Sequence, residues 1–168
     1  MSSPRVQTVI ADPFRFAEDG ENIRGEVAVD SLPRLFDLLE NREGTLRYCV
    51  AGVQNPDGRP RLILTVEGSL SLRCQRCLGG VRWKADVRSE LEPYRSGQVI
   101  PDEELENDEV DAFETEGELD VVALIEDEIL LSMPIAPRHE TCRPPEPGGG
   151  NEKQSPFAVL SRLKDNKT

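Results

Sequence analysis

Apolar and polar residues alternate most regularly between residues 81 and 91 of the 168-residue chain. A period of two is typical of a β-strand with one buried and one exposed face. One face of this segment carries Val81, Trp83, Ala85 and Val87, and the other carries Arg82, Lys84, Asp86 and Arg88. The pattern predicts a strand whose buried face is apolar, Trp83 included, and whose exposed face is mostly basic.

Two further segments rich in Val, Ile, Leu and Thr precede this strand, at residues 45–53 and 61–74. Residues 55–58, Asn-Pro-Asp-Gly, separate them, and Asp-Gly suits the tight turn of a β-hairpin. We therefore expect a hairpin, with a β-bulge where Gly68 interrupts the alternation. Cys49 alternates with apolar neighbours in the first of these strands and is expected to lie in the core.

Two segments carry apolar residues at helical spacing. In residues 31–40, Ser31 can cap a short amphipathic helix that buries Leu32, Leu35, Phe36 and Leu39. In residues 120–132, Asp120 is the expected N-cap, Pro134 stops the helix, and the core-facing stripe consists of Val122, Ile125, Ile129 and Met133. Three acidic residues of this helix are expected to face solvent: Glu126, Asp127 and Glu128.

Together these elements predict a single α+β domain over residues 1–142, with an antiparallel sheet from about residue 23 to residue 95 and the longer helix packed on it. Residues 101–116 are expected to form an exposed, disordered acidic connector. Residues 143–154 are rich in Pro and Gly, which is typical of a flexible linker. Residues 155–168 form a short amphipathic tail segment with Phe157, Leu160 and Leu163 on one face. Two helical turns are not stable alone, so we expect this segment to dock on its own domain or on a partner.

The net charge of −12 is unevenly distributed along the chain. Residues 1–100 hold 14 basic and 14 acidic residues, whereas residues 101–168 hold 6 basic and 18 acidic ones. The acidic part repels polyanions over roughly 8 Å at physiological salt, which disfavours tight general binding of RNA. Local contact with RNA stays open for the basic section, where the candidate residues are Arg73, Arg76, Arg82, Lys84 and Arg88. The acidic section can hold a very basic protein, and its candidate residues are Asp102, Glu103, Glu104, Glu106, Asp108 and Glu109, with Phe157, Leu160 and Leu163 of the tail.

The chain has neither a secretory signal nor an apolar run of the roughly 18 residues that a membrane span needs, so we expect a cytoplasmic protein with reduced thiols. Cys74 and Cys77 have the two-residue spacing found in zinc sites, and His139 and Cys142 can supply the other two ligands of a Cys₃His site. Two alternatives stay open: the pair only shapes a turn, or it is a redox pair. A redox pair is disfavoured because its first cysteine usually lies at a helix N-terminus, whereas this pair lies between two predicted strands.

An enzyme is not indicated. The chain has one histidine and lacks the serine nucleophile elbow, the phosphate-binding loop and the His-Glu-x-x-His zinc motif. Three classes of function stay open: a factor that contacts RNA, an acidic module that binds a basic protein without RNA contact, and a cysteine-based metal or redox sensor.

Three segments resemble the bacterial YceD family of large ribosomal RNA subunit accumulation proteins: LRCQRCLGGV at 72–81, GELDVVALIEDEILLSMPIAPRHETC at 117–142, and SPFAVLSRLK at 155–164. The resemblance implies a cytoplasmic, non-enzymatic ribosome biogenesis factor needed for accumulation or processing of 23S ribosomal RNA or for large-subunit assembly. Its implied partners are 23S rRNA or a large-subunit precursor, and a basic ribosomal protein or assembly factor. The family's Cys-x-Arg-Cys segment falls on Cys74, Arg76 and Cys77. The resemblance implies that some members carry a further Cys-x-x-Cys near the C-terminal part, which would complete a zinc site. This chain has only His139 and Cys142 there.

Overall fold

The computed structural model describes residues 8–102, 106–107 and 109–145. Within them, five strands form one sheet in the order β2-β3-β4-β5-β6. Strands β2 to β5 are antiparallel, and β6 runs parallel to β5 at the edge. The strands are β2 (Asn22–Ala28), β3 (Thr45–Gln54), β4 (Pro60–Arg73), β5 (Gly80–Arg95) and β6 (Asp111–Thr115). The predicted α+β class is confirmed, and the parallel strand β6 is an addition that lies inside the predicted connector.

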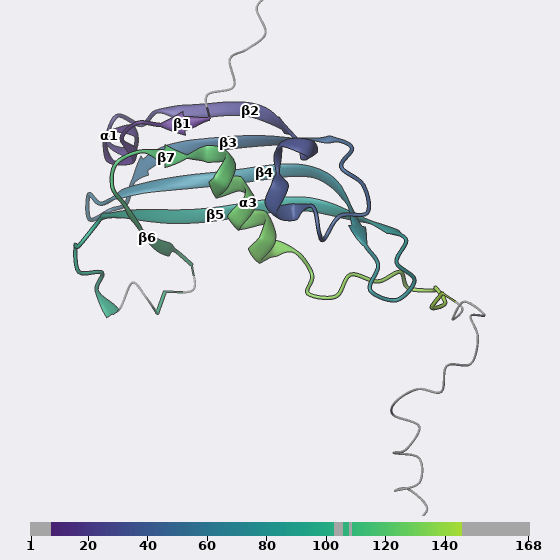
Figure 1. Ribbon diagram of the computed structural model, residues 1–168. Helices are drawn as coiled ribbons and strands as arrows, with labels where there is room; N and C mark the ends of the chain where they lie inside the picture. Colours follow the sequence, from purple (N-terminus) through teal and green to yellow (C-terminus); the bar gives the residue numbers. More distant parts are fainter. Residues whose placement is uncertain (1–7, 103–105, 108, 146–168) are drawn as a thin grey trace, which may run out of the picture.

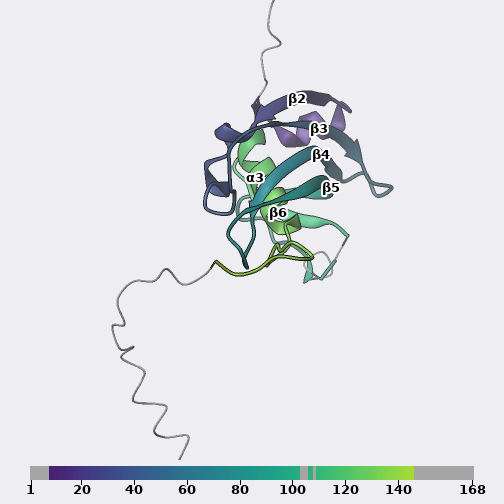
Figure 2. The ribbon, with the colours of Figure 1, turned by 90° about the vertical axis from the view of Figure 1, so that its right-hand side faces the viewer.

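Alternation along β4 and β5 divides their side chains between the two faces of the sheet. On the inner face, Val66 and Ala85 are buried, and Trp83 packs partly buried against the same core. Helices α1 (Pro13–Glu18) and α3 (Val121–Ser132) contact strands of this sheet, and α3 crosses its inner face (Figure 1, Figure 2). The outer face exposes Arg82, Lys84, Asp86 and Arg88. The predicted two-faced strand is confirmed.

The predicted hairpin is also confirmed, but two details of it are wrong. Gly58 adopts a φ of 78° in the turn, and Asn55 closes the turn by donating its backbone N–H to Arg59. Gly68 makes no bulge, because the pairing of β4 with β5 continues through it without an extra residue. A Cβ at Gly68 would lie 2.4 Å from Leu46 Cδ2, so glycine is needed there for close packing. Cys49 lies half-buried on the outer face rather than in the core.

The predicted helix at residues 31–40 is wrong. The segment forms two 3₁₀ turns, η1 (Val29–Ser31) and η2 (Pro33–Leu35), and then runs beside β4 through a bridge between Leu39 and Leu72. Leu32, Leu35 and Leu39 are nevertheless buried. The helical spacing therefore predicted which residues enter the core, whereas Pro33 and the backbone bonds to β4 prevented a continuous α-helix.

Helix α1 was not predicted. Asp12 caps it by accepting the backbone N–H groups of Phe14 and Arg15 at 3.0 and 3.1 Å, and Pro13 occupies a first-turn position. A Cβ at Gly52 of β3 would lie 2.3 Å from the Phe16 carbonyl oxygen, so this glycine lets the helix approach the sheet. The Asp-Pro pair was the available sequence signal.

Helix α3 begins where the sequence predicts, with the Asp120 side chain accepting the N–H groups of Val122 and Ala123. The short strands β1 (Val9–Ile10) and β7 (Leu119–Asp120) pair just before it. The expectation that its acidic residues face solvent is wrong for two of them. Glu126 is buried and accepts the backbone N–H of Arg34 at 2.9 Å, and Glu128 is buried against the Ser89 hydroxyl. Only Asp127 is exposed, beside Arg34.

Glu128 gives a pH-dependent test of this packing. Burial raises the pKa of its carboxyl more than the Ser89 hydrogen bond lowers it, and the charges of Asp111 and Asp127 raise it further. Because the folded-state pKa lies above the unfolded one, the associated stability is present at low pH and is lost as the pH rises through the folded pKa. We expect Glu128→Gln to stabilise the fold by on the order of 1 kcal/mol at pH 8, or about 2–4 °C, and to have little effect at pH 4.

Thermal unfolding at both pH values measures this effect. Glu118→Gln, at an exposed position just before α3, is the matched control and should change neither midpoint. A Glu128→Gln protein that is less stable than the wild type at pH 8 would show that the ionised carboxylate is the favoured native form.

Candidate metal centre

A tight turn that joins β4 to β5 presents the first two candidate ligands. Cys74 donates its backbone N–H to the Gly79 carbonyl at 2.8 Å, and Leu78 donates to the Cys74 carbonyl at 2.9 Å. The N–H groups of Arg76 and Cys77 point at Cys74 Sγ from 3.4 and 3.5 Å. The turn therefore surrounds one buried sulfur with hydrogen-bond donors, as is usual around a thiolate or a metal-bound sulfur.

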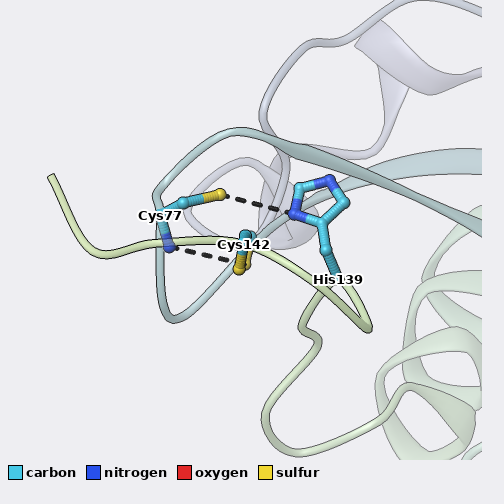
Figure 3. Close-up of side chains that lie close together, drawn as sticks. Cys77, His139 and Cys142 are labelled. Carbon is cyan, nitrogen blue, oxygen red and sulfur yellow. Dashed lines mark hydrogen bonds between the residues drawn. The ribbon is translucent and has the colours of Figure 1, made fainter.

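The segment after α3 brings the other two candidate ligands to this turn. The Gln75 backbone N–H donates to the Pro137 carbonyl at 2.8 Å, which holds the segment against the turn. His139 Nε2 lies 2.9 Å from the Gly80 carbonyl oxygen at the start of β5. In Figure 3, Cys77 from the turn and His139 and Cys142 from the C-terminal segment point toward one another.

The donor atoms of Cys74, Cys77, His139 and Cys142 all lie within 4.8 Å of one another. Cys74 Sγ and Cys142 Sγ are 3.8 Å apart, and Cys77 Sγ is 3.4 Å from His139 Nδ1. Four ligands around a tetrahedral ion with metal–sulfur bonds of about 2.3 Å have S···S and S···N separations of roughly 3.6–3.8 Å. The cluster has the size of a tetrahedral site, and its sulfurs are too far apart for a disulfide, whose S–S bond is about 2.05 Å.

The histidine is also oriented for metal binding. A carbonyl oxygen only accepts, so the contact with Gly80 places the imidazole proton on Nε2 and leaves the Nδ1 lone pair facing the three sulfurs. Such a hydrogen bond on the distal nitrogen is the usual way a protein fixes a ligating histidine. The sequence-predicted set of four ligands is thus brought together, in an arrangement that could hold a metal ion.

The thiols differ strongly in acidity. Burial alone would raise the pKa of Cys74, but hydrogen bonds from the backbone of Cys77, Arg76 and His139 and from the Cys77 side chain lower it to about 5. Burial raises the pKa of Cys142, and its interactions with Cys74 and Cys77 raise it further. The protein alone therefore stabilises a thiolate at Cys74, whereas Cys142 needs a cation to be deprotonated as a ligand.

The candidate arginines fall into two groups. Lys84 pairs with Asp86 and Arg88 with Glu90 on the outer face, so their charges are partly neutralised. Arg73, Arg76 and Arg82 surround the turn and make no ion pair among the described residues.

Two arginines that the sequence analysis missed extend the second group. Arg138 and Arg143 are exposed, and each adjoins a candidate ligand in the sequence. Their position depends on the path of the segment after α3, and the only sequence signal for it was their proximity to His139 and Cys142. We call Arg73, Arg76, Arg82, Arg138 and Arg143 the basic rim.

The acidic candidates are only partly described. Asp102, Glu106 and Glu109 are exposed, and β6 follows them as an edge strand. Glu103, Glu104 and Asp108 lie outside the described residues, as do Phe157, Leu160 and Leu163 of the tail. The structure brings none of the described acidic candidates into the cysteine cluster.

Comparison with known proteins adds to this geometry. The family described as large ribosomal RNA subunit accumulation protein YceD matches residues 62–164, which include all four candidate ligands. The chain belongs to the YceD family. A curated YceD protein of the same description from Haemophilus influenzae is 26% identical over 165 residues, covering 91% of this chain and 93% of the relative. No solved structure matches the chain.

The description of the family refers to accumulation of the large ribosomal RNA subunit and names no chemical reaction. YceD proteins are thereby connected with the RNA of the large ribosomal subunit. Among the described residues, no helix has the length and apolar character that crossing a membrane requires.

Proposed function

We propose that this YceD protein is a non-enzymatic, cytoplasmic ribosome biogenesis factor that contacts 23S rRNA, or a large-subunit precursor, through its basic rim. The observation that supports this most is the gathering of five arginines at one turn, none of which forms an ion pair within the described part of the chain, although the chain has a large excess of acidic residues. Phosphate contacts need locally uncompensated positive charge, and arginine also stacks on unpaired bases.

A zinc ion is the metal we propose for the cluster, held by Cys74, Cys77, His139 and Cys142. Zinc prefers four sulfur and nitrogen ligands in a closed tetrahedral site, and there it acts as a structural link rather than a catalyst. This chain's own residues then do the recognition: the link fixes the segment carrying Arg138 and Arg143 beside the turn carrying Arg73 and Arg76. Metal binding and RNA contact are two functions of the same turn in this proposal.

The acidic section is proposed to hold a basic ribosomal protein or assembly factor. Asp102, Glu106 and Glu109 are exposed, so they present several negative charges to solvent without burying them. Such a surface attracts a lysine-rich partner over about one Debye length and does so less at high salt. The same charge would keep the rest of the chain from binding RNA without selectivity.

Neutralising the basic rim tests the RNA contact. We expect the double variant Arg82→Gln, Arg138→Gln to bind in vitro transcribed 23S rRNA about tenfold more weakly at 0.15 M salt, with a salt slope lower by about 1.5. The matched control is Arg15→Gln, Arg24→Gln, which changes the net charge equally at exposed arginines away from the turn. Filter binding across a salt series gives both quantities.

A measurement of 23S rRNA in cells separates this function from that of an acidic module without RNA contact. In a strain lacking the gene, the rim variant should restore 23S rRNA less well than the control variant. If both variants restored it fully and bound RNA equally, the RNA contact would be rejected in favour of an acidic module that holds a basic protein without RNA contact.

A further inference from the structure

An apolar groove lies beside the metal centre, between the end of α3 and the segment that follows it. Its lining is free of charged residues and includes Leu38, Leu130, Met133, Ile135 and Pro137. Gln75 lines it too, so the groove adjoins the turn that carries Cys74. Its volume is about 220 Å³, smaller than the roughly 300–1,000 Å³ of small-molecule sites, and it suits a few side chains of a peptide.

The groove leaves large apolar side chains in water. Leu38 is 40% exposed and Ile135 is fully exposed, although both are long aliphatic residues. Large exposed apolar residues that gather at one place usually mark a surface covered by another segment or molecule. The neighbouring Leu131 is 76% exposed but does not line the groove, so it can serve as a control position for substitutions in the groove.

We propose that residues 155–164 of this chain occupy the groove, with Phe157, Leu160 and Leu163 as the inserted side chains. These ten residues, SPFAVLSRLK, carry apolar residues three positions apart and basic residues at Arg162 and Lys164. The groove lining itself carries no charged residue. An amphipathic segment entering an apolar groove through residues three or four apart is a common recognition mode.

The chain between the described domain and residues 155–164 is long enough for this segment to reach the groove. The described chain ends at Pro145, three residues after Cys142, whose sulfur lies 3.8 Å from that of Cys74 in the turn beside the groove. Eleven residues separate Pro145 from Phe157, and the twelve Cα-to-Cα steps between them span up to about 40 Å when extended. A short tether of this length corresponds to an effective concentration of about 1 mM, so a contact with a dissociation constant near 0.1 mM is mostly closed.

The extent of the family match agrees with an intramolecular role. The YceD match covers residues 62–164, so it includes both the proposed docking segment and Leu130, the groove residue on α3. The inference is independent of RNA binding and of the metal's identity. It assigns the free protein a tail that covers an otherwise exposed apolar surface.

Hydrogen–deuterium exchange of the full chain tests the contact. We expect amides of residues 157–164 to exchange about tenfold more slowly than in the unbound segment, given an effective concentration of about 1 mM and a dissociation constant near 0.1 mM. Ile135→Asp should abolish that protection. Because Ile135 is fully exposed, we expect this variant to fold like the wild type. Leu131→Asp, which places the same charge on an exposed leucine outside the groove, should retain it.

Each other outcome contradicts the proposal. A tail without protection in the wild type rejects docking altogether. Protection that survives Ile135→Asp places the tail elsewhere, and protection that grows with protein concentration assigns the groove to the tail of a second copy. Far-ultraviolet circular dichroism of each variant confirms that the domain itself stays folded.

Discussion

Cys74→Ser should abolish metal binding and lower the thermal midpoint by about 10 °C. Cys74 and Cys142 are 68 residues apart in the sequence and 3.8 Å apart at their sulfurs. In the chain-entropy model, a link that closes a loop of this length stabilises the fold by about 4 kcal/mol, and each kcal/mol is worth roughly 2–4 °C in a domain of this size. Native mass spectrometry should find one zinc per wild-type chain and none in the variant.

Two controls separate the metal from the side chain. Cys49→Ser, a half-buried thiol on the outer face, should retain the zinc and the midpoint. A strong chelator should lower the wild-type midpoint toward that of Cys74→Ser and leave the variant unchanged. The zinc proposal would be wrong if the wild-type protein carried no metal after purification without a tag and a chelator did not destabilise it.

If the wild-type protein carried no metal, the reactivity of the Cys74 thiol would have to explain the cluster. A metal-free Cys74 with a pKa of about 5 would be a thiolate at neutral pH and would react quickly with alkylating agents. Zinc-bound cysteines are instead protected until the ion is removed. The rate of thiol labelling with and without chelator therefore distinguishes a structural metal centre from a redox or sensor cysteine.

The set of four candidate ligands could be predicted from spacing, but its surroundings could not. A two-residue gap places Cys74 and Cys77 in one turn, and the chain's single histidine lies three residues from another cysteine. The inclusion of Arg138 and Arg143 in the basic rim depends on where the segment after α3 runs. The hydrogen bond from Gln75 to Pro137 and the contact of His139 with Gly80 hold that segment against the turn, and no local sequence pattern reveals them.

The fold shows the same division between local and long-range information. Asp120 and the apolar spacing after it predicted α3, because capping and periodicity are local properties. The prediction that Glu126 and Glu128 face solvent rested on their polarity alone and was wrong. Glu126 is buried against the Arg34 backbone N–H, and Glu128 is buried against the Ser89 hydroxyl. Burial of a carboxylate depends on a partner from a distant part of the chain, so the sequence pattern gave no sign of it.

Strand β6 escaped prediction for a related reason. Its residues, Asp111–Thr115, follow an acidic stretch and have no long apolar alternation. They become a strand because β5 extends to Arg95 and offers an unpaired edge, along which β6 pairs in parallel. An edge strand gains its hydrogen bonds from the neighbouring strand and needs little apolar character of its own.

Removing Glu92 should give the largest loss of stability outside the candidate metal centre, about 2–4 kcal/mol or roughly 5–15 °C for Glu92→Leu at pH 7. Its side chain is 2% exposed and accepts hydrogen bonds from Arg59 Nη1 at 3.3 Å, Arg61 Nε at 3.2 Å and the Tyr94 hydroxyl at 2.8 Å. Arg61 is itself only 20% exposed, so the variant leaves a largely buried cation without its main partner. Thermal or urea unfolding measures the loss.

The pH dependence tests the cause of that loss. Burial alone would raise the pKa of Glu92, but the hydrogen bonds from Tyr94, Arg61 and Arg59 and the charge of Arg59 together lower it below the ordinary value of 4.5. A lowered folded-state pKa means that the stabilisation is complete above the unfolded value and is lost as the pH falls through the folded one. The difference between wild type and Glu92→Leu should thus be constant from pH 6 to pH 8 and shrink below about pH 4.5.

Glu90→Gln is the matched control, because Glu90 pairs with Arg61 and Arg88 at a partly exposed position, and such pairs contribute about 1 kcal/mol or less. A Glu92 effect no larger than that of Glu90, or one that persists unchanged at pH 3, would mean that the glutamate acts through packing rather than charge. Glu92 and Glu128 lie in one small domain with pKa shifts of opposite sign. Their variants should therefore respond to acid in opposite directions, which a general change in packing cannot reproduce.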